Sequence, residues 1–100
     1  MLTGKQRSYL RKLGQEIDPL VYIGKNDMTD TVLNEMDTLL DSRELVKAKI
    51  QESSTLDAKE AANEMARILG AEYVQAIGRR FVLYRRAKDP EKRNIILPKK

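Results

Sequence analysis

A glycine-containing loop that enters a helix is the first place in this sequence where the residue types suggest chemistry. Gly24-Lys25-Asn26-Asp27 follows a short apolar run and precedes an amphipathic stretch. The first N–H groups of a helix have no partner within it, and together with the helix dipole they attract phosphate. Gly24 lets a ligand approach the backbone, Lys25 adds positive charge, and Asn26 tolerates left-handed backbone angles. The pattern predicts a phosphate-binding loop; the alternative is a loop that only connects two elements.

The loop does not match the two common nucleotide-phosphate motifs. It lacks the Gly-Lys-Ser/Thr ending of a Walker loop, and the second and third glycines of a dinucleotide fingerprint do not follow Gly24. We therefore expect no nucleotide cofactor at this position.

Basic residues gather at the two ends of the chain. Residues 1–14 carry four basic and no acidic side chains, residues 15–77 carry six basic and thirteen acidic ones, and residues 78–100 carry nine basic and two acidic ones. If the two ends meet in space, they form one basic face on an otherwise acidic body, which is typical of a polyanion-binding protein. The alternative is solvated charge on a helix and on a tail.

The chain contains no histidine and no cysteine. This composition excludes disulfides, thiolate nucleophiles and the usual zinc ligand sets, and it removes the commonest general acid–base group near neutral pH. Asp37 and Asp41 lie one helical turn apart and could share a proton or a metal, but solvated charge on a helix surface explains them better. We expect a protein without catalytic activity, cofactor or metal.

The length of 100 residues predicts a single domain over residues 1–100, with residues 86–100 as a loosely held basic tail. No apolar run approaches the roughly 20 residues of a membrane span. The first residues lack the apolar core of a signal peptide. We expect a cytoplasmic protein that is monomeric and does not contact membranes.

The hydrophobic pattern predicts three helices and four strands. Apolar residues recur at helical spacing over residues 4–13, 30–41 and a stretch that opens at 53–55 and ends at 69. Strands are expected at residues 20–23, 45–50, 73–77 and 80–85. Thr3 and Gln6 fit a capping box, Gly14 and Gly70 fit positions just past helix ends, and Gly78-Arg79 fits a two-residue hairpin turn.

The resulting order, α-β-α-β-α-β-β, predicts an α/β fold with two layers. Strands joined through helices should be parallel and the last two should form an antiparallel hairpin, so the four-stranded sheet is mixed, with the second and third helices on one face. The continuous apolar runs at residues 20–23 and 80–85 predict strands covered on both faces. The first helix or residues 95–97 could provide the second cover. Residues 45–50 alternate, which predicts a polar face carrying Lys47 and Lys49.

Three segments resemble a known family when they are taken together in this order and spacing. They are residues 2–7 (LTGKQR), 21–26 (VYIGKN) and 77–85 (IGRRFVLYR), followed by the closing residues 96–98. They resemble the YhbY family, the stand-alone bacterial form of the CRM domain, named for chloroplast RNA splicing and ribosome maturation. The resemblance implies RNA binding, association with precursors of the large ribosomal subunit, and a fold like the C-terminal domain of translation initiation factor three.

The family has a GxxG loop between its first strand and the following helix, and that loop falls on residues 24–27. Asp27 stands where the last loop glycine is expected. Its carboxylate could cap the helix and keep the loop shape, or it could repel a phosphate. The sequence leaves both alternatives open.

We predict a composite RNA-binding surface from the charge pattern and the family loop. Its residues are Lys5, Arg7, Arg11 and Lys12 on the first helix, Gly24, Lys25 and Asn26 in the loop, and Arg79, Arg80, Arg85 and Arg86 at and beyond the hairpin. Each cation has a structural alternative, such as packing of Arg85 under the tail.

The chain has five aromatic residues and its core needs them, so we expect recognition of the RNA backbone rather than base stacking. A module that docks on ribosomal proteins or assembly factors is the alternative function, and DNA binding is disfavoured because no helix pair resembles a helix-turn-helix.

Overall fold

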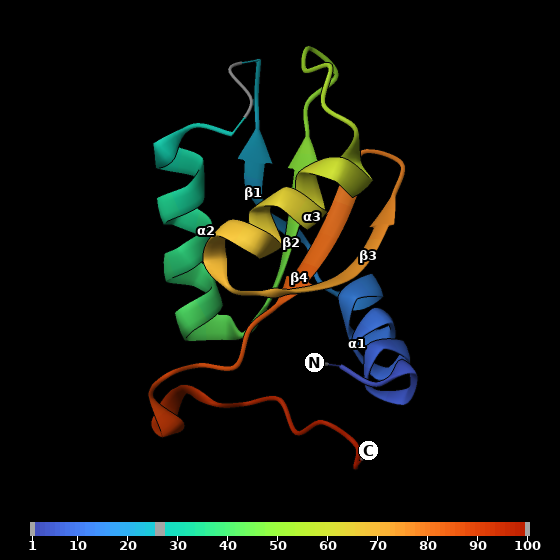
Figure 1. The fold of residues 1–100 in the computed structure, drawn as a ribbon, viewed down its shortest axis with the longest axis vertical. Helices are drawn as coiled ribbons and strands as arrows, with labels where there is room; N and C mark the ends of the chain where they lie inside the picture. The colour runs from blue at the N-terminus through green and yellow to red at the C-terminus, as the bar shows by residue number, and fades with distance from the viewer. Residues whose placement is uncertain (1, 26–27, 100) are drawn as a thin grey trace.

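A mixed four-stranded sheet separates two layers of covering elements in the computed structural model, which describes residues 2–25 and 28–99 (Figure 1). The helices are α1 (Gly4–Glu16), α2 (Asp30–Arg43) and α3 (Ala58–Leu69), and a 3₁₀ turn, η1, spans Pro90–Lys92. The strands are β1 (Pro19–Ile23), β2 (Leu45–Ile50), β3 (Glu72–Ile77) and β4 (Arg80–Tyr84). Helices α2 and α3 cover one face, whereas α1 and the C-terminal segment cover part of the other.

The strand order is β1-β2-β4-β3, with β1 parallel to β2 and with β4 antiparallel to both β2 and β3. The strands that are joined through α2 and α3 therefore run in the same direction, as expected for crossover connections. This arrangement confirms the predicted α/β fold, the order of its elements and the mixed sheet. It also makes β1 and β3 the two edge strands.

The first apolar cluster lies between the sheet and the pair α2 and α3. It contains Ile23, Ile50 and Phe81 from the sheet and Met36 and Met65 from the helices, all almost completely buried. Burial of an apolar side chain of this size contributes about 1.5–3 kcal/mol, so this cluster is the main source of stability.

The prediction that residues 20–23 are covered on both faces is wrong. Val21 and Ile23 are fully buried, but Leu20 is 40% exposed and Tyr22 is 53% exposed. The two exposed side chains point away from the first cluster because side chains alternate along a strand. The element that shares their side of the sheet, α1, does not cover them.

Helix α1 begins as predicted and ends later than predicted. Gln6 N donates to Thr3 Oγ1 and Thr3 N donates to Gln6 Oε1, both at 3.1 Å, which confirms the capping box. Gly14 does not end the helix, because it lies inside it against β4. A Cβ on Gly14 would lie 3.2 Å from Val82 Cγ2, so this glycine serves close approach of the helix to the sheet.

Local signals at the other element ends are partly as predicted. Thr29 caps α2, since Val32 N donates to its hydroxyl at 3.2 Å. Helix α3 starts at Ala58 and not at residues 53–55, because Asp57 caps it: Glu60 N donates to the Asp57 carboxylate at 3.1 Å. Gly70 ends α3 with a φ of +63°, and Gly78 occupies the hairpin turn with a φ of +60°.

Strand β4 is covered on both faces, as predicted. Its second face carries Val82 and Tyr84, which pack in a second apolar cluster with Leu10 of α1. Ile95 and Leu97 of the C-terminal segment pack against the same cluster. The helix and the C-terminal segment therefore share the task of covering this face.

A buried carboxylate attaches the C-terminal segment to the domain. Glu44 caps the end of α2 with a φ of +68° and is fully buried. Its Oε2 accepts from Ala87 N at 2.9 Å, and its Oε1 accepts from Asn94 N at 2.8 Å and Ile95 N at 3.1 Å. The sequence predicts a loosely held tail at residues 86–100 and gives no sign of these three bonds. They attach residues 87, 94 and 95 of that segment to the end of α2.

The two ends of the described chain lie next to each other. This is the condition under which the basic residues at the two ends could form one face. Gln6 Nε2 donates to the Pro98 carbonyl at 3.0 Å. Leu2 lies in the second apolar cluster, against which Leu97 packs. The N-terminal helix and the C-terminal segment are therefore neighbours on the same side of the sheet.

Arg85 connects three elements at the end of β4. Its Nη1 donates to Asp37 Oδ1 and the Leu69 carbonyl, both at 2.8 Å, and its Nη2 donates to the Asp37 carbonyl at 2.9 Å and Asp41 Oδ1 at 3.1 Å. Its side chain is 12% exposed. The expectation that Asp37 and Asp41 carry only solvated charge is wrong, because both pair with this guanidinium.

We predict that Arg85→Ala lowers the free energy of unfolding by about 2–4 kcal/mol, because it leaves two carboxylates and two carbonyls without their charged donor. The neighbouring Arg86 is exposed and provides a matched control. Urea denaturation followed by circular dichroism measures both variants. Equal stability of Arg85→Ala and Arg86→Ala would contradict the structural role of Arg85.

We also predict that Glu44→Gly destabilises the protein although glycine suits a φ of +68°. The three N–H groups would lose their acceptor, at a cost of about 2–4 kcal/mol that exceeds the relief of backbone strain. The stability of Glu44→Gln should fall between that of the parent protein and that of Glu44→Gly. Its amide oxygen can keep the two bonds from Asn94 N and Ile95 N, whereas its NH₂ group faces the N–H of Ala87. Hydrogen exchange at Asn94 and Ile95 reports release of the segment, and a Glu44→Gly variant more stable than the parent would refute this role.

Candidate nucleic-acid interface

Three segments that are distant in the sequence meet at one end of the sheet (Figure 1). Gln51 N donates to the Ile23 carbonyl at 2.8 Å, and Ile50 N donates to the Arg79 carbonyl at 2.7 Å. These bonds place the segment after β1, the segment after β2 and the β3–β4 turn side by side. We call this region the loop end and define it by Gly24, Lys25, residues 51–53, Gly78 and Arg79.

Gly24 and Lys25 lie at the loop end as the sequence predicts. Gly24 does not have a positive φ, and a Cβ on it would meet only the Gln51 side chain, at 3.4 Å. Backbone strain therefore does not explain this glycine, whereas access for a ligand would. Lys25 is exposed. The predicted contact residue Asn26 and the variant loop position Asp27 lie outside the described residues.

The start of α2 is less suited to phosphate than the sequence predicts. Thr29 Oγ1 already accepts from Val32 N, and the carboxylate of Asp30 lies in the first turn. A negative charge at this position interacts favourably with the helix dipole and competes with an incoming anion. The attraction for phosphate at the loop end must therefore come mainly from side-chain cations.

Arg79 is the best-placed of these cations. Its Nη1 donates to the Gln51 carbonyl at 3.3 Å and to the Ser54 carbonyl at 3.4 Å, and the residue is exposed. A guanidinium has five N–H donors in a planar fork. Within the described chain the bonds of Arg79 use Nη1, which leaves Nε and Nη2 for a phosphate.

A row of side chains crosses the sheet next to the loop end. Register pairs Tyr22 with Lys49, Lys49 with Arg80, and Arg80 with Ile77. We call these four residues the open row. They point away from α2 and α3, because their neighbours Ile23, Ile50 and Phe81 lie in the first apolar cluster. Arg80 is exposed, Lys49 is half-buried, and Ile77 is 64% exposed.

The sequence predicts only part of the open row. Lys49 is predicted on a polar sheet face and Arg80 in the RNA-binding surface, whereas Tyr22 is predicted in the core. The available signal was the register of the first strand, in which Leu20 and Tyr22 alternate with the buried Val21 and Ile23. A cavity of about 520 Å³ joins the open row to the loop end. It is lined by Tyr22, Lys49, Gln51, Glu52, Ser53 and Arg79.

Helix α1 lies beside β3, away from the loop end (Figure 1). Arg7 Nε donates to the Tyr73 carbonyl at 3.3 Å, and Arg11 Nε donates to the Val74 carbonyl at 3.4 Å. Both arginines thus fasten α1 to the sheet, whereas Lys5 and Lys12 are exposed. The predicted composite surface is therefore divided, since the helix cations form a separate strip.

The last two predicted contact residues lie at the far end of β4. Arg85 is occupied by Asp37, Asp41 and two carbonyls, so a role in RNA contact does not fit its surroundings. Its exposed neighbour Arg86 lies at the opposite end of β4 from the loop end. The structure thus brings Gly24, Lys25, Arg79 and Arg80 together and separates them from Arg86.

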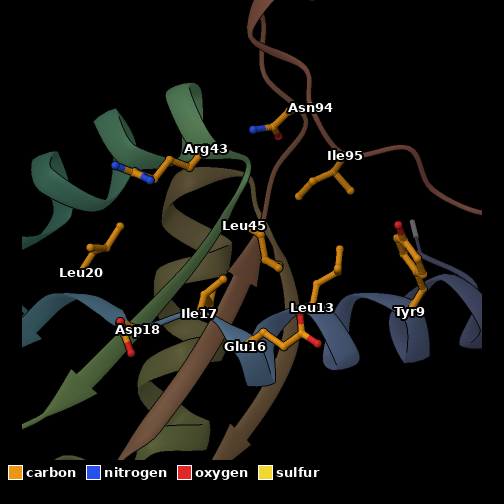
Figure 2. Close-up of a pocket in the computed structure, with 10 residues that line it drawn as sticks. All are labelled: Tyr9, Leu13, Glu16, Ile17, Asp18, Leu20, Arg43, Leu45, Asn94 and Ile95. Carbon is orange, nitrogen blue, oxygen red and sulfur yellow. The ribbon is translucent and has the colours of Figure 1, made fainter.

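A larger groove lies elsewhere, between α1, the end of α2 and the C-terminal segment (Figure 2). Its volume is about 690 Å³, and Leu13, Leu45 and Ile95 gather in its middle. Its ionic groups are of both signs, with Arg43 on one wall and Glu16 on another. This mixture does not favour a polyanion, so the loop end and the open row form the candidate interface.

Two further kinds of site find no support in the described residues. No group of three or more carboxylates there is arranged to hold a metal ion. None of the helices within residues 2–25 and 28–99 combines the length and the apolar character needed to cross a membrane.

Comparison with known proteins gives a consistent result. The family model for the CRS1 / YhbY (CRM) domain matches residues 2–85. The chain is 32% identical over 98 residues to the "Probable RNA-binding protein YqeI" of Bacillus subtilis, covering 98% of this chain and 100% of that protein. It is 34% identical over 99 residues to an "RNA-binding protein" of Haemophilus influenzae, covering 99% and 97%. The solution structure of the hypothetical protein SAV1595 from Staphylococcus aureus shares 38% identity at a TM-score of 0.80, covering 98% of this chain and 100% of that one.

We predict that Arg79→Gln loosens the segment after β2 without unfolding the domain, because the guanidinium holds the Gln51 and Ser54 carbonyls. Amide hydrogen exchange should accelerate at Ser54 and Leu56, while the free energy of unfolding changes by less than about 1 kcal/mol. Arg80→Gln is the matched control, since Arg80 is also exposed and its side chain does not hold these carbonyls. Equal exchange in the two variants would contradict this role of Arg79.

Proposed function

Because this chain belongs to the CRS1 / YhbY (CRM) domain family, we propose that it is an RNA-binding protein that contacts the phosphate backbone of structured ribosomal RNA. Its place would be the assembly of the large ribosomal subunit, as the family resemblance implies. Two of its relatives carry RNA binding in their names. The observation that carries the proposal is that the segment with Gly24 and Lys25 and the turn with Arg79 lie on either side of the end of β2, at the loop end.

The geometry of the loop end suits a sugar–phosphate backbone. Lys25 and Arg79 come from different segments, and the N–H groups of Ile50 and Gln51 hold those segments on either side of β2 by donating to the Arg79 and Ile23 carbonyls. Two cations on a fixed support can contact successive phosphates, and the rigid fork of Arg79 can donate two parallel bonds to one phosphate. Contacts of this kind position RNA and carry little sequence information.

The strip of cations on α1 supports a second, weaker zone of contact. Lys5 and Lys12 are exposed, and the bonds that Arg7 and Arg11 make to the β3 carbonyls use only Nε. A structured RNA that is long enough to reach from the loop end to α1 would contact both zones. A short oligonucleotide would contact the loop end alone.

A second candidate function is docking on ribosomal proteins or assembly factors. The groove in Figure 2 favours it, because Tyr9 is 38% exposed and Leu20 is 40% exposed at its margins. The two functions can coexist, since the groove and the loop end are separate. Association with pre-ribosomal particles that resists nuclease treatment would support docking on protein.

We predict that Lys25→Glu and Arg79→Glu each weaken binding to large-subunit ribosomal RNA about tenfold or more at moderate salt. Each variant removes one phosphate contact, so the slope of log affinity against log salt should become shallower by nearly one per variant. Lys92→Glu changes the net charge equally but lies on η1, far from the loop end, and should have a much smaller effect.

Filter-binding titrations across a salt series measure these affinities, with duplex DNA of equal charge as the competitor. The parent protein should prefer RNA, since A-form geometry and 2′-hydroxyl groups distinguish it from DNA. Equal weak binding of both nucleic acids, or equal losses in Lys92→Glu and Arg79→Glu, would show that only net charge acts and would overturn the proposal.

A further inference from the structure

The open row adds a kind of contact that phosphate binding does not need. We propose that the cavity between the open row and the loop end takes an unpaired nucleotide of the bound RNA, with its base stacked on Tyr22 and its phosphates paired with Lys49 and Arg79. This inference rests on the proposed function and deepens it, because it states which structural class of RNA position the protein selects.

The exposure of Tyr22 is the first observation. Its side chain is 53% exposed on an edge strand, although an aromatic ring gains more free energy from burial than most side chains do. Strand β1 has β2 on one side only, so no further strand covers the ring. Aromatic rings that stand free on a strand are the platforms on which single-stranded nucleic acids stack their bases.

The charges around Tyr22 are the second observation. Lys49 is its direct partner on β2, and Arg80 follows Lys49 on β4. Arg79 lines the same cavity from the turn. An aromatic ring flanked by cations matches a nucleotide, which presents a flat base and a charged phosphate a few ångströms apart. The lining also contains the acidic Glu52, so the positive charge that attracts a phosphate there comes from Lys49 and Arg79.

The size of the cavity is the third observation. Its volume of about 520 Å³ lies within the usual range of small-ligand sites, roughly 300–1,000 Å³. A base within a duplex is already stacked on both sides and cannot lie on Tyr22. The site therefore selects loops, bulges or strand ends, whereas the cations of the loop end accept paired and unpaired backbone alike.

The absence of tryptophan from the sequence allows a direct test. Tyr22→Trp introduces a single strong fluorophore into the open row, and Ile68→Trp introduces one at an exposed position of α3, which covers the opposite face of the sheet, as a matched control. Both proteins are titrated with an RNA hairpin that has a single-stranded loop and with a fully paired RNA duplex of equal length. We expect the indole fluorescence of the Tyr22→Trp variant to be strongly quenched by the hairpin and weakly by the duplex. The fluorescence of the Ile68→Trp variant should change little with either RNA.

Binding affinities complete the test. Tyr22→Ala should bind the hairpin roughly tenfold more weakly, as the loss of one stacked base requires, while its affinity for the duplex stays unchanged. Tyr22→Phe keeps the ring and should bind both RNAs like the parent. Because Tyr22 lies on the surface, circular dichroism should show all three variants at this position folded.

The outcomes separate this inference from the proposed function. If Tyr22→Ala binds the hairpin like the parent while Arg79→Glu binds weakly, the stacking site is wrong and RNA binding stands. Equal quenching of the Tyr22→Trp variant by hairpin and duplex would likewise overturn selection of an unpaired base. If the parent protein binds neither RNA at moderate salt, the proposed function fails, and the stacking site fails with it.

Discussion

The carboxylate of Glu44 is the interaction on which the arrangement of the basic face depends. It holds the backbone of the C-terminal segment through three N–H groups, and the main-chain carbonyl of the same residue accepts from Arg85 N at 2.9 Å. The segment thereby reaches the second apolar cluster and helps to hold α1 on the sheet. Helix α1 and the C-terminal segment lie on the face of the sheet opposite α2 and α3, and they cover only the part of it that is remote from the loop end. The open row, which lies on the same face, therefore remains accessible.

Much of the fold could be predicted from local sequence signals. Helical spacing, the Thr3 capping box and the hairpin glycine all correspond to features of the structure, because each depends on a few neighbouring residues. The failures concern relations between distant residues. Gly14 resembles a helix-ending glycine until Val82 is seen against it. Arg85 resembles a free cation until its partners on α2, 44 and 48 residues away, are known.

The candidate site shows the same division between local and distant information. A strand, a glycine and a lysine in succession identify Gly24 and Lys25 without knowledge of the fold. Positive charge alone could not separate the arginines, because Arg7 and Arg11 bond carbonyls of β3 whereas Arg85 is held by Asp37 and Asp41. Tyr22 was missed because a short apolar run gives no sign of whether its strand lies at the centre or at the edge of a sheet.

The bonds from α1 to β3 have a consequence for the behaviour of the protein in concentrated solution. Unpaired strand edges are templates on which other chains can add strands and aggregate. Arg7 and Arg11 occupy carbonyls of the β3 edge, and the register of β3 against β4 shifts between Tyr73 and Gln75. The opposite edge, on β1, also has a register shift and begins with Pro19, which has no N–H to donate. Both edges thus resist strand addition, so the molecule can display an uncovered aromatic and basic sheet face without polymerising through its backbone.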